Sequence, residues 1–198
     1  MNLFLISYSV PVTSLMKQCI ANCEMLHIPY GEKQWNNKAE CWKISRAFCD
    51  LTQETKDFME PHFARVQALT TNGHSNWVFS ERFIPFWETA IGPPKIKLSP
   101  QTKSILVKLL APRTPFRRKN GFWITLEKIY SDIEYLVEII GNPVDHRPEL
   151  HTATSNTLNI QNLKPRTTYC MRARIKILFY SKIGEYGGKR CVTTSEDI

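Results

Sequence analysis

The chain has 198 residues, of which 42% are hydrophobic, and it carries a formal net charge of +8 at pH 7. This length is sufficient for two modules of about 100 residues each, and the hydrophobic fraction excludes a disordered chain. No apolar run approaches the roughly 20 residues that a membrane span needs, and the positive charge favours an acidic partner such as an acidic protein or a heparan-like polysaccharide.

Residues 1–29 differ in character from the rest of the chain. They begin with the apolar, uncharged run MNLFLISYSVPVTSLM, which is either a weak secretory signal or a plain terminal segment. Cys19, Cys23 and His27 have a spacing that a helix would turn into a partial metal site, but a fourth ligand is not evident. We therefore expect neither a metal nor a cofactor.

A β-hairpin is predicted from Phe63 to Phe83. Residues 63–69 alternate between two faces, which is typical of a half-buried strand. The dipeptide Asn72-Gly73 follows, a strong signal for a tight hairpin turn. Residues 77–79 begin the return strand.

The stretch RFIPFWETAIGPP (82–94) places three aromatic residues before a glycine and two prolines. Consecutive prolines fix the backbone, remove two amide donors and force the preceding residue to be extended. We interpret this stretch as the last strand of a first module and an elbow to a second one. Trp87, Pro93 and Pro94 are the predicted elbow residues.

The second half of the chain alternates short strands with frequent turns. We expect a long basic loop over residues 111–121 and helical spacing over 124–133, with Thr125 as a candidate cap. The predicted strands are 95–98, 104–110, 135–140, 157–160, 169–176 and 189–193. Such a pattern, with almost no helix, predicts an all-β sandwich.

The motif Leu163-x-Pro165-x-x-x-Tyr169 sharpens this prediction. In Greek-key sandwiches a tyrosine at the start of a late strand folds back, and its hydroxyl bonds to an upstream backbone group. This tyrosine corner is a structural feature and implies no chemistry.

Six cysteines leave two interpretations open. Two pairs, Cys41/Cys49 and Cys170/Cys191, are spaced as local bridges of an oxidising compartment; alternatively, all six are reduced thiols. Nucleophilic catalysis by Cys49 with His62 or His74 lacks a third group to orient the histidine, so we expect no enzyme. No recognition helix, zinc finger or aromatic RNA platform accompanies the scattered basic residues, so we expect no nucleic-acid partner.

Seven segments carry a resemblance to a known family. They are YGEKQW (30–35), AECW (39–42), CDLTQET (49–55), FARVQA (63–68), RFIPFWETAIGPP (82–94), ITLEKIYSDIEY (124–135) and LKPRTTYC (163–170). Over residues 30–192 the chain resembles the extracellular region of a class II cytokine receptor, which consists of tandem fibronectin type III sandwiches. Within that family it is most similar to receptors and soluble binding proteins for interleukin-20 and interleukin-22.

The resemblance implies the disulfides Cys41–Cys49 and Cys170–Cys191 and a ligand held by loops around the elbow. The implied ligand-binding residues are Tyr30, Gly31, Thr71, Asn72, Gly73, His74, Arg117, Leu178, Phe179 and Tyr180. The implied ligand is a helical cytokine of the interleukin-10 family, with interleukin-22 as first choice. Because the sequence ends soon after Val192 without a membrane span, we expect a secreted, monomeric decoy receptor. The alternatives are a truncated ectodomain of a signalling receptor subunit and a basic adhesion or heparin-binding module that uses residues 113–119.

Two departures from the family pattern affect the first module. Residues 1–29 do not resemble the opening strands of the family, so the predicted domains are a divergent segment (1–29), a partial module truncated at its N-terminus (30–92) and a complete module (93–198). His62 occupies the expected position of the corner tyrosine of the first module. We expect that corner to be weakened and His62 to lie at the surface.

Overall fold

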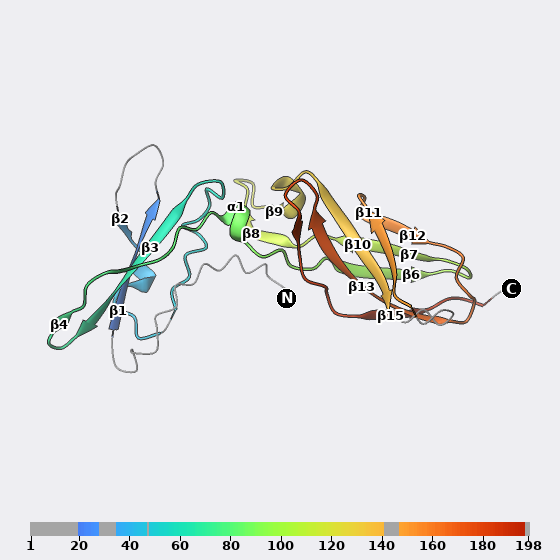
Figure 1. Cartoon of the computed structure of the whole chain (residues 1–198), viewed down its shortest axis with the longest axis horizontal. Helices are drawn as coiled ribbons and strands as arrows, with labels where there is room; N and C mark the ends of the chain where they lie inside the picture. Colours follow the sequence, from blue (N-terminus) through green and yellow to red (C-terminus); the bar gives the residue numbers. More distant parts are fainter. Residues whose placement is uncertain (1–19, 28–34, 47, 141–146, 197–198) are drawn as a thin grey trace. The chain divides into compact units, whose positions relative to one another are not determined.

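The computed structural model describes residues 20–27, 35–46, 48–140 and 147–196 (Figure 1). It contains fifteen strands, one short α-helix and two single-turn 3-10 helices among these residues, which confirms the predicted all-β class. The described chain divides into two compact units. The first unit ends at Thr89, and the second begins at Ala90.

The strands of the first unit form one sheet in the order β2-β1-β3-β4, with β5 also paired to β3. Their bounds are β1 (Ile20–His27), β2 (Trp35–Asn37), β3 (His62–Thr70), β4 (Gly73–His74) and β5 (Val78–Phe79). The predicted hairpin is confirmed. Its first strand is β3, its tip is at residues 71–72, and the returning strands β4 and β5 both pair with β3. Gly73 has φ +136°, a conformation that is open to glycine and rare for other residues.

The strand β1 corrects the interpretation of residues 1–29 as a segment apart from the first module. It pairs with β3 along its whole length, from Ile20 opposite Leu69 to His27 opposite His62. Its run IANCEMLH mixes apolar residues with Asn22 and Glu24, so its alternation is too weak to predict a strand. The first unit therefore includes a strand that we did not predict.

His62 and Tyr169 occupy similar positions in the two units. The Tyr169 hydroxyl accepts a hydrogen bond of 3.0 Å from the Lys164 amide, which confirms the tyrosine corner. The expectation of a surface histidine is wrong, because His62 is fully buried, and its Nε2 donates to the Asp57 carbonyl oxygen at 3.0 Å. Both bonds reach back five residues from the start of a long strand.

The aromatic stretch after β5 also differs from its prediction. In place of a last strand, Phe83 forms an isolated bridge with His62, and Pro85–Glu88 form the short helix α1. Proline is favoured in the first turn of a helix, where its missing amide proton is not needed. The Glu88 carboxylate accepts a hydrogen bond from the Ile84 amide at 2.9 Å and closes this turn.

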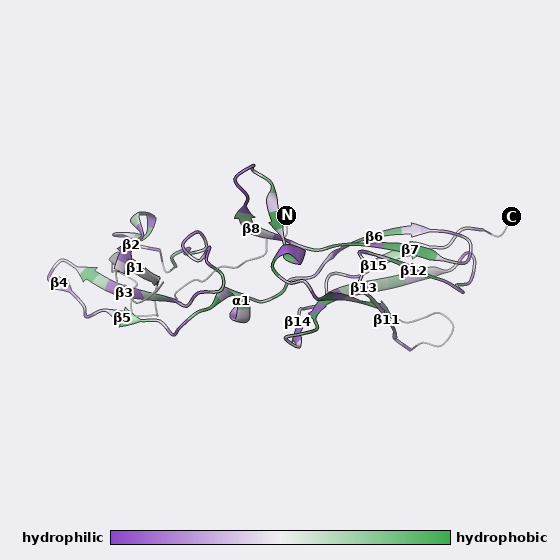
Figure 2. Cartoon of the chain, turned by 90° about the horizontal axis from the view of Figure 1, so that it is seen from above, coloured by the Kyte–Doolittle hydropathy of each residue, from purple (hydrophilic) through white to green (hydrophobic). Residues whose placement is uncertain are grey.

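The second unit is a sandwich of two main sheets with a separate hairpin. One sheet has the order β11-β10-β13-β14, with β15 also paired to β13; the other has the order β12-β7-β6; and β8 pairs with β9. The bounds are β6 (Lys95–Pro100), β7 (Ile105–Leu110), β8 (Arg113–Arg117), β9 (Trp123–Thr125), β10 (Ile133–Ile140), β11 (Glu149–Ala153), β12 (Thr157–Ile160), β13 (Thr168–Ile177), β14 (Lys182–Ile183) and β15 (Arg190–Thr193). Figure 2 shows the two layers, with β6 and β7 in one and β13 and β11 in the other.

The core of the second unit follows from the alternation along its strands. Side chains one position apart point to opposite faces of a strand, so alternate apolar residues collect between the two sheets. Residues of β7 meet residues of β10 and β13 there. The fully buried apolar side chains are Ile105, Val107, Leu109, Val137, Ile139, Met171, Ala173, Ile175 and Ile177.

Two predictions for the second unit are wrong in detail. The expected basic loop over 111–121 contains β8, which pairs with β9 across an irregular register. The expected helix over 124–133 is reduced to the 3-10 turn η2 (Leu126–Lys128), because its first residues belong to β9 and its last residue belongs to β10. Thr125, the candidate cap, makes no side-chain hydrogen bond to this turn.

Candidate ligand-binding loops

The turn between β13 and β14 presents three large apolar side chains to solvent. Leu178, Phe179 and Tyr180 are 42%, 81% and 37% exposed, and the rings of Phe179 and Tyr180 meet edge to face at 5.0 Å. These three predicted ligand-binding residues therefore lie together on one turn, which we call the apolar tip. Aromatic side chains of this kind supply most of the binding energy of many protein interfaces.

The backbone of the apolar tip is fixed by Asp132. The amide of Leu178 donates to the Asp132 carbonyl oxygen at 3.1 Å, and the amide of Phe179 donates to the Asp132 carboxylate. The amide of Ser181 then donates to the Leu178 carbonyl oxygen at 3.2 Å, and Ser181 takes a φ of +50°. A tip that is ordered before it binds loses less conformational entropy on binding.

Tyr130 lies beneath the apolar tip as a buried, neutral group. Only 4% of it is exposed, and the Lys182 ammonium lies 6.0 Å from its ring centroid. Burial, with a smaller contribution from Tyr180, raises the pKa of Tyr130 to about 12. At physiological pH the Tyr130 hydroxyl is therefore neutral.

The β8–β9 hairpin supplies a second exposed aromatic residue that sequence analysis missed. The Arg117 guanidinium lies 3.8 Å from the Trp123 ring centroid and donates to the Gly121 carbonyl oxygen at 3.1 Å. Gly121 has φ +81°, and the next residue, Phe122, is 71% exposed. Arg117 thus shapes the hairpin, while Phe122 presents the larger exposed apolar surface. The sequence does contain a signal for this exposed residue, because an aromatic residue directly after a turn glycine lies at the tip of a hairpin.

The tip of the first unit is polar. Thr71, Asn72, Gly73 and His74 are all exposed, as predicted for a loop, but none offers a large apolar surface. The side-chain amide of Gln67 donates to His74 Nδ1 at 3.1 Å, so this histidine ring is held beside β3. A polar tip of this kind is suited to the rim of a protein interface, whereas large aromatic side chains supply most of the binding energy at its centre.

The remaining predicted residues are only partly described. Tyr30, Gly31 and Cys19 lie outside the described residues, as do the side chains of Cys23 and His27. Trp87 is 50% exposed on α1 and meets Phe86 edge to face at 5.0 Å. The roles of Trp87, Pro93 and Pro94 in an elbow remain predictions.

Both predicted disulfides are present. The sulfurs of Cys41 and Cys49 are 2.04 Å apart, and those of Cys170 and Cys191 are 2.08 Å apart. Cys170 and Cys191 stand directly opposite each other on β13 and β15. Because Cys49 is bonded to Cys41, it has no thiol to act as a nucleophile.

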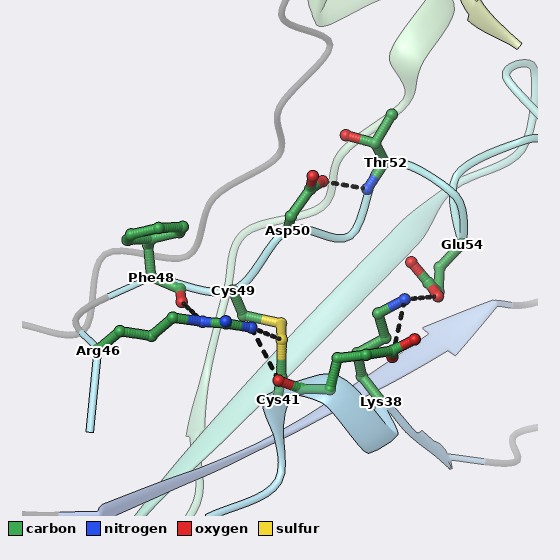
Figure 3. Close-up of a disulfide and its surroundings, with 9 residues drawn as sticks. Lys38, Cys41, Arg46, Phe48, Cys49, Asp50, Thr52 and Glu54 are labelled. Atoms are coloured by element: carbon green, nitrogen blue, oxygen red, sulfur yellow. Dashed lines mark hydrogen bonds and ion pairs between the residues drawn. A yellow bond between two sulfur atoms is a disulfide. The ribbon is translucent and has the colours of Figure 1, made fainter. Parts of the chain in front are cut away.

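Polar contacts hold the loop around the first disulfide (Figure 3). Arg46 donates to the carbonyl oxygens of Phe48 at 3.1 Å and Glu40 at 2.8 Å, and so joins the two sides of the loop. Lys38 pairs with Glu54 and Glu40; burial opposes protonation, but these two carboxylates hold the pKa of Lys38 above its ordinary value. These contacts make the loop a structural element of the first unit.

Among the described residues, no group of three or more histidines, cysteines, aspartates or glutamates is placed to hold a metal ion. Within the same residues, no helix is both long and apolar enough to cross a membrane.

A two-sheet sandwich with a tyrosine corner defines the second unit as a fibronectin type III module. A family model described as interferon-alpha/beta receptor, fibronectin type III, matches residues 89–195, and one described as tissue factor matches residues 23–77. The chain belongs to the class II cytokine receptor family. This family consists of receptors, not enzymes.

Individual relatives support this membership. The interleukin-22 receptor subunit alpha-2 is 34% identical to the chain in Homo sapiens, over 82% of this chain and 62% of the relative, and 33% identical in Rattus norvegicus, over 82% and 71%. The interleukin-20 receptor subunit alpha of Homo sapiens is 36% identical over 85% of this chain. The chain spans only 30% of the length of that receptor.

A solved structure supports the fold. The chicken interferon gamma receptor alpha chain matches with a TM-score of 0.64, over 92% of this chain and 88% of the receptor chain. Its sequence is 22% identical, so this similarity shows the fold alone.

Proposed function

We propose that the chain binds a helical cytokine of the interleukin-10 family, with interleukin-22 as first choice, and acts as a secreted decoy. Two observations support this proposal. Relatives that are about a third identical to the chain over the aligned residues are named as receptor subunits for interleukin-22 and interleukin-20. The chain itself presents an ordered apolar tip that suits a protein partner.

The proposed mechanism is competitive occlusion without chemistry. The apolar tip covers a face of the cytokine that a signalling receptor would otherwise use. Phe179 supplies the largest exposed area of the tip, and the Asp132 hydrogen bonds hold it in place. The observation that carries the proposal is this combination of an 81% exposed phenylalanine with a fixed backbone.

Direct binding to a panel of interleukin-10-family cytokines tests the proposal, with interleukin-22 first. Replacing Phe179 by alanine should weaken binding more than tenfold, as expected for an aromatic hot spot. Leu150→Ala is the matched control, because Leu150 is 53% exposed on β11, away from the tip. Wild-type chain that binds no member of the panel, or a Phe179→Ala variant that binds as tightly as wild type, would overturn the proposal.

A second candidate is the ectodomain of a signalling receptor subunit. The relative with 36% identity is a receptor subunit of which the chain spans 30%. A transcript that continues this sequence into a membrane span would favour this candidate. Transcripts that all end at Ile198 would favour the decoy.

A further inference from the structure

The positive charge of the chain is concentrated in the second unit. Residues 90–198 contain 18 lysines and arginines against 9 aspartates and glutamates, a net charge of +9. Residues 1–89 contain 8 against 9, a net charge of −1, and the two values add to the total of +8. The source of any attraction to a polyanion therefore lies in the fibronectin type III module that begins at Ala90.

The sheet that contains β10 and β13 compensates its charges in register. Glu134 lies opposite Lys176, and Glu138 lies opposite Arg172. Both pairs form ion pairs, at 3.9 Å for the first and at a shorter separation for the second. Opposite charges at facing positions stabilise a sheet, so Lys176 and Arg172 already have partners of opposite charge within this sheet.

The sheet of β6, β7 and β12 instead places like charges at facing positions. Its exposed face carries Lys95, Lys97 and Lys108, and Lys97 lies directly opposite Lys108. The three strands KIKLSP, ILVKLL and TLNI contain no aspartate or glutamate. In the part of the chain that the structure describes, none of these three lysines makes an ion pair. Like charges at facing positions destabilise a sheet, so this arrangement is unfavourable for folding alone.

The spacing of these lysines creates a dense positive surface. Facing residues of an antiparallel pair are about 5 Å apart, and alternate residues along a strand are about 6.6 Å apart. The three lysine side chains therefore extend from positions that lie within about 8 Å of one another. This distance is about the Debye length at physiological salt, so their positive charges reinforce one another. Such a surface attracts a partner whose negative charges are equally dense.

We propose that the exposed face of β6, β7 and β12 binds a sulfated polysaccharide. Protein interfaces are enriched in aromatic residues and arginine and depleted of lysine, whereas this face has three lysines and neither of the enriched types. The two disulfides indicate an oxidising, extracellular compartment, while anionic lipids gather on the cytoplasmic leaflet. A sulfated polysaccharide is the dense polyanion that fits both observations.

Figure 2 supports a binding surface that extends beyond the sheet. The β8 hairpin rises on the side of the second unit where β6 lies. This hairpin carries Arg113, Arg117, Arg118 and Lys119, and all four are exposed. The sheet face and the hairpin can therefore contact one long polymer. The apolar tip is a separate feature, and polysaccharide binding does not depend on the proposed cytokine function.

The test uses the full chain, immobilised heparin, and the double variant Lys97→Thr/Lys108→Thr. Threonine is well suited to an exposed strand position, so the change removes charge and keeps the fold. The matched control is Arg147→Thr/Lys164→Thr, which removes two exposed charges from loops outside the sheet of β6, β7 and β12. We expect the sheet variant to bind heparin at 0.15 M NaCl about tenfold more weakly than wild type, with a salt dependence reduced by about one unit of slope per lysine. The control variant should bind nearly as wild type does.

Unfolding measurements on the same variants separate binding from structure. The sheet variant should be as resistant to denaturant as wild type or more so, because a repulsive pair is gone. The single variants Lys97→Thr and Lys108→Thr repeat the test if the double variant does not fold. Equal losses of heparin binding in the sheet and control variants would show attraction by net charge alone and would overturn the proposal. No binding to heparin, or binding only to phosphatidylserine vesicles or to an acidic protein, would also overturn it.

Discussion

At the scale of single residues, Gly184 shows how close approach of two backbones fixes a residue type. A Cβ placed on Gly184 would lie 2.4 Å from the Ile91 carbonyl oxygen, a distance that real structures do not show. The neighbouring Gly187 would place a Cβ 3.1 Å from the Pro93 side chain. Residues just after Thr89 therefore pack against the segment before β15 within the second unit.

We predict that Gly184→Ala destabilises the second unit by about 2 kcal/mol or more, because backbone must move to make room. Gly188→Ala is the control, since nothing lies within 4 Å of its added Cβ. Chemical denaturation of both variants measures the difference. Equal stability of the two variants would contradict the proposed close approach.

The tyrosine corner gives a second prediction at this scale. Tyr169→Phe removes the hydroxyl that accepts from the Lys164 amide, at an expected cost of about 1–3 kcal/mol. Tyr180→Phe, at a partly exposed tyrosine, should change the free energy of unfolding by less than about 0.5 kcal/mol. A Tyr169→Phe variant as stable as wild type would show that the corner bond contributes nothing.

Tyr130 gives a prediction for alkaline pH. Its pKa is raised from 10.0 to about 12 in the folded chain, so the contribution of its neutral form is complete below pH 10 and is lost as the pH rises through 12. Stability measured against pH should fall over this range, and the fall should be smaller in Tyr130→Phe. Identical pH profiles for the variant and the wild type would contradict this assignment.

At the scale of elements, the apolar tip depends on a residue that lies outside it. Asp132 accepts from two successive amides of the β13–β14 turn, yet it has no contact role of its own in the proposal. Asp132→Ala should therefore lower cytokine affinity by loosening Phe179, with little change in the stability of the sandwich. Binding kinetics and denaturation of this variant provide the check. Unchanged affinity would mean that the tip needs no support.

The elements also show why sequence analysis succeeded in some places and failed in others. Strong alternation in β3, β7 and β13 predicted strands, and Leu163, Pro165 and Tyr169 predicted the corner, because these patterns act locally. The failures were non-local: the pairing of β1 with β3 and the strand character of β8 depend on partners that adjacent residues do not specify. The sequence predicts a surface position for His62, because residue types alone do not show that the Asp57 carbonyl oxygen can accept a hydrogen bond from its buried ring.

At the scale of the whole molecule, the chain combines two kinds of surface. The apolar tip suits a protein ligand, and the lysine face of β6, β7 and β12 suits a polyanion. The described strands of the first unit form a single sheet, whereas those of the second unit form a sandwich. A receptor of this family that is retained on polysaccharide would concentrate its cytokine trap where that polymer is abundant.

The most direct test of the account is inhibition of signalling by the full chain. Interleukin-22 is mixed with increasing amounts of the chain and added to cells that carry the interleukin-22 signalling receptor. We predict that the response falls as the chain approaches the concentration of the cytokine, and that Phe179→Ala must be added at more than ten times the wild-type concentration for the same effect. An undiminished response at a large excess of folded wild-type chain would contradict the account.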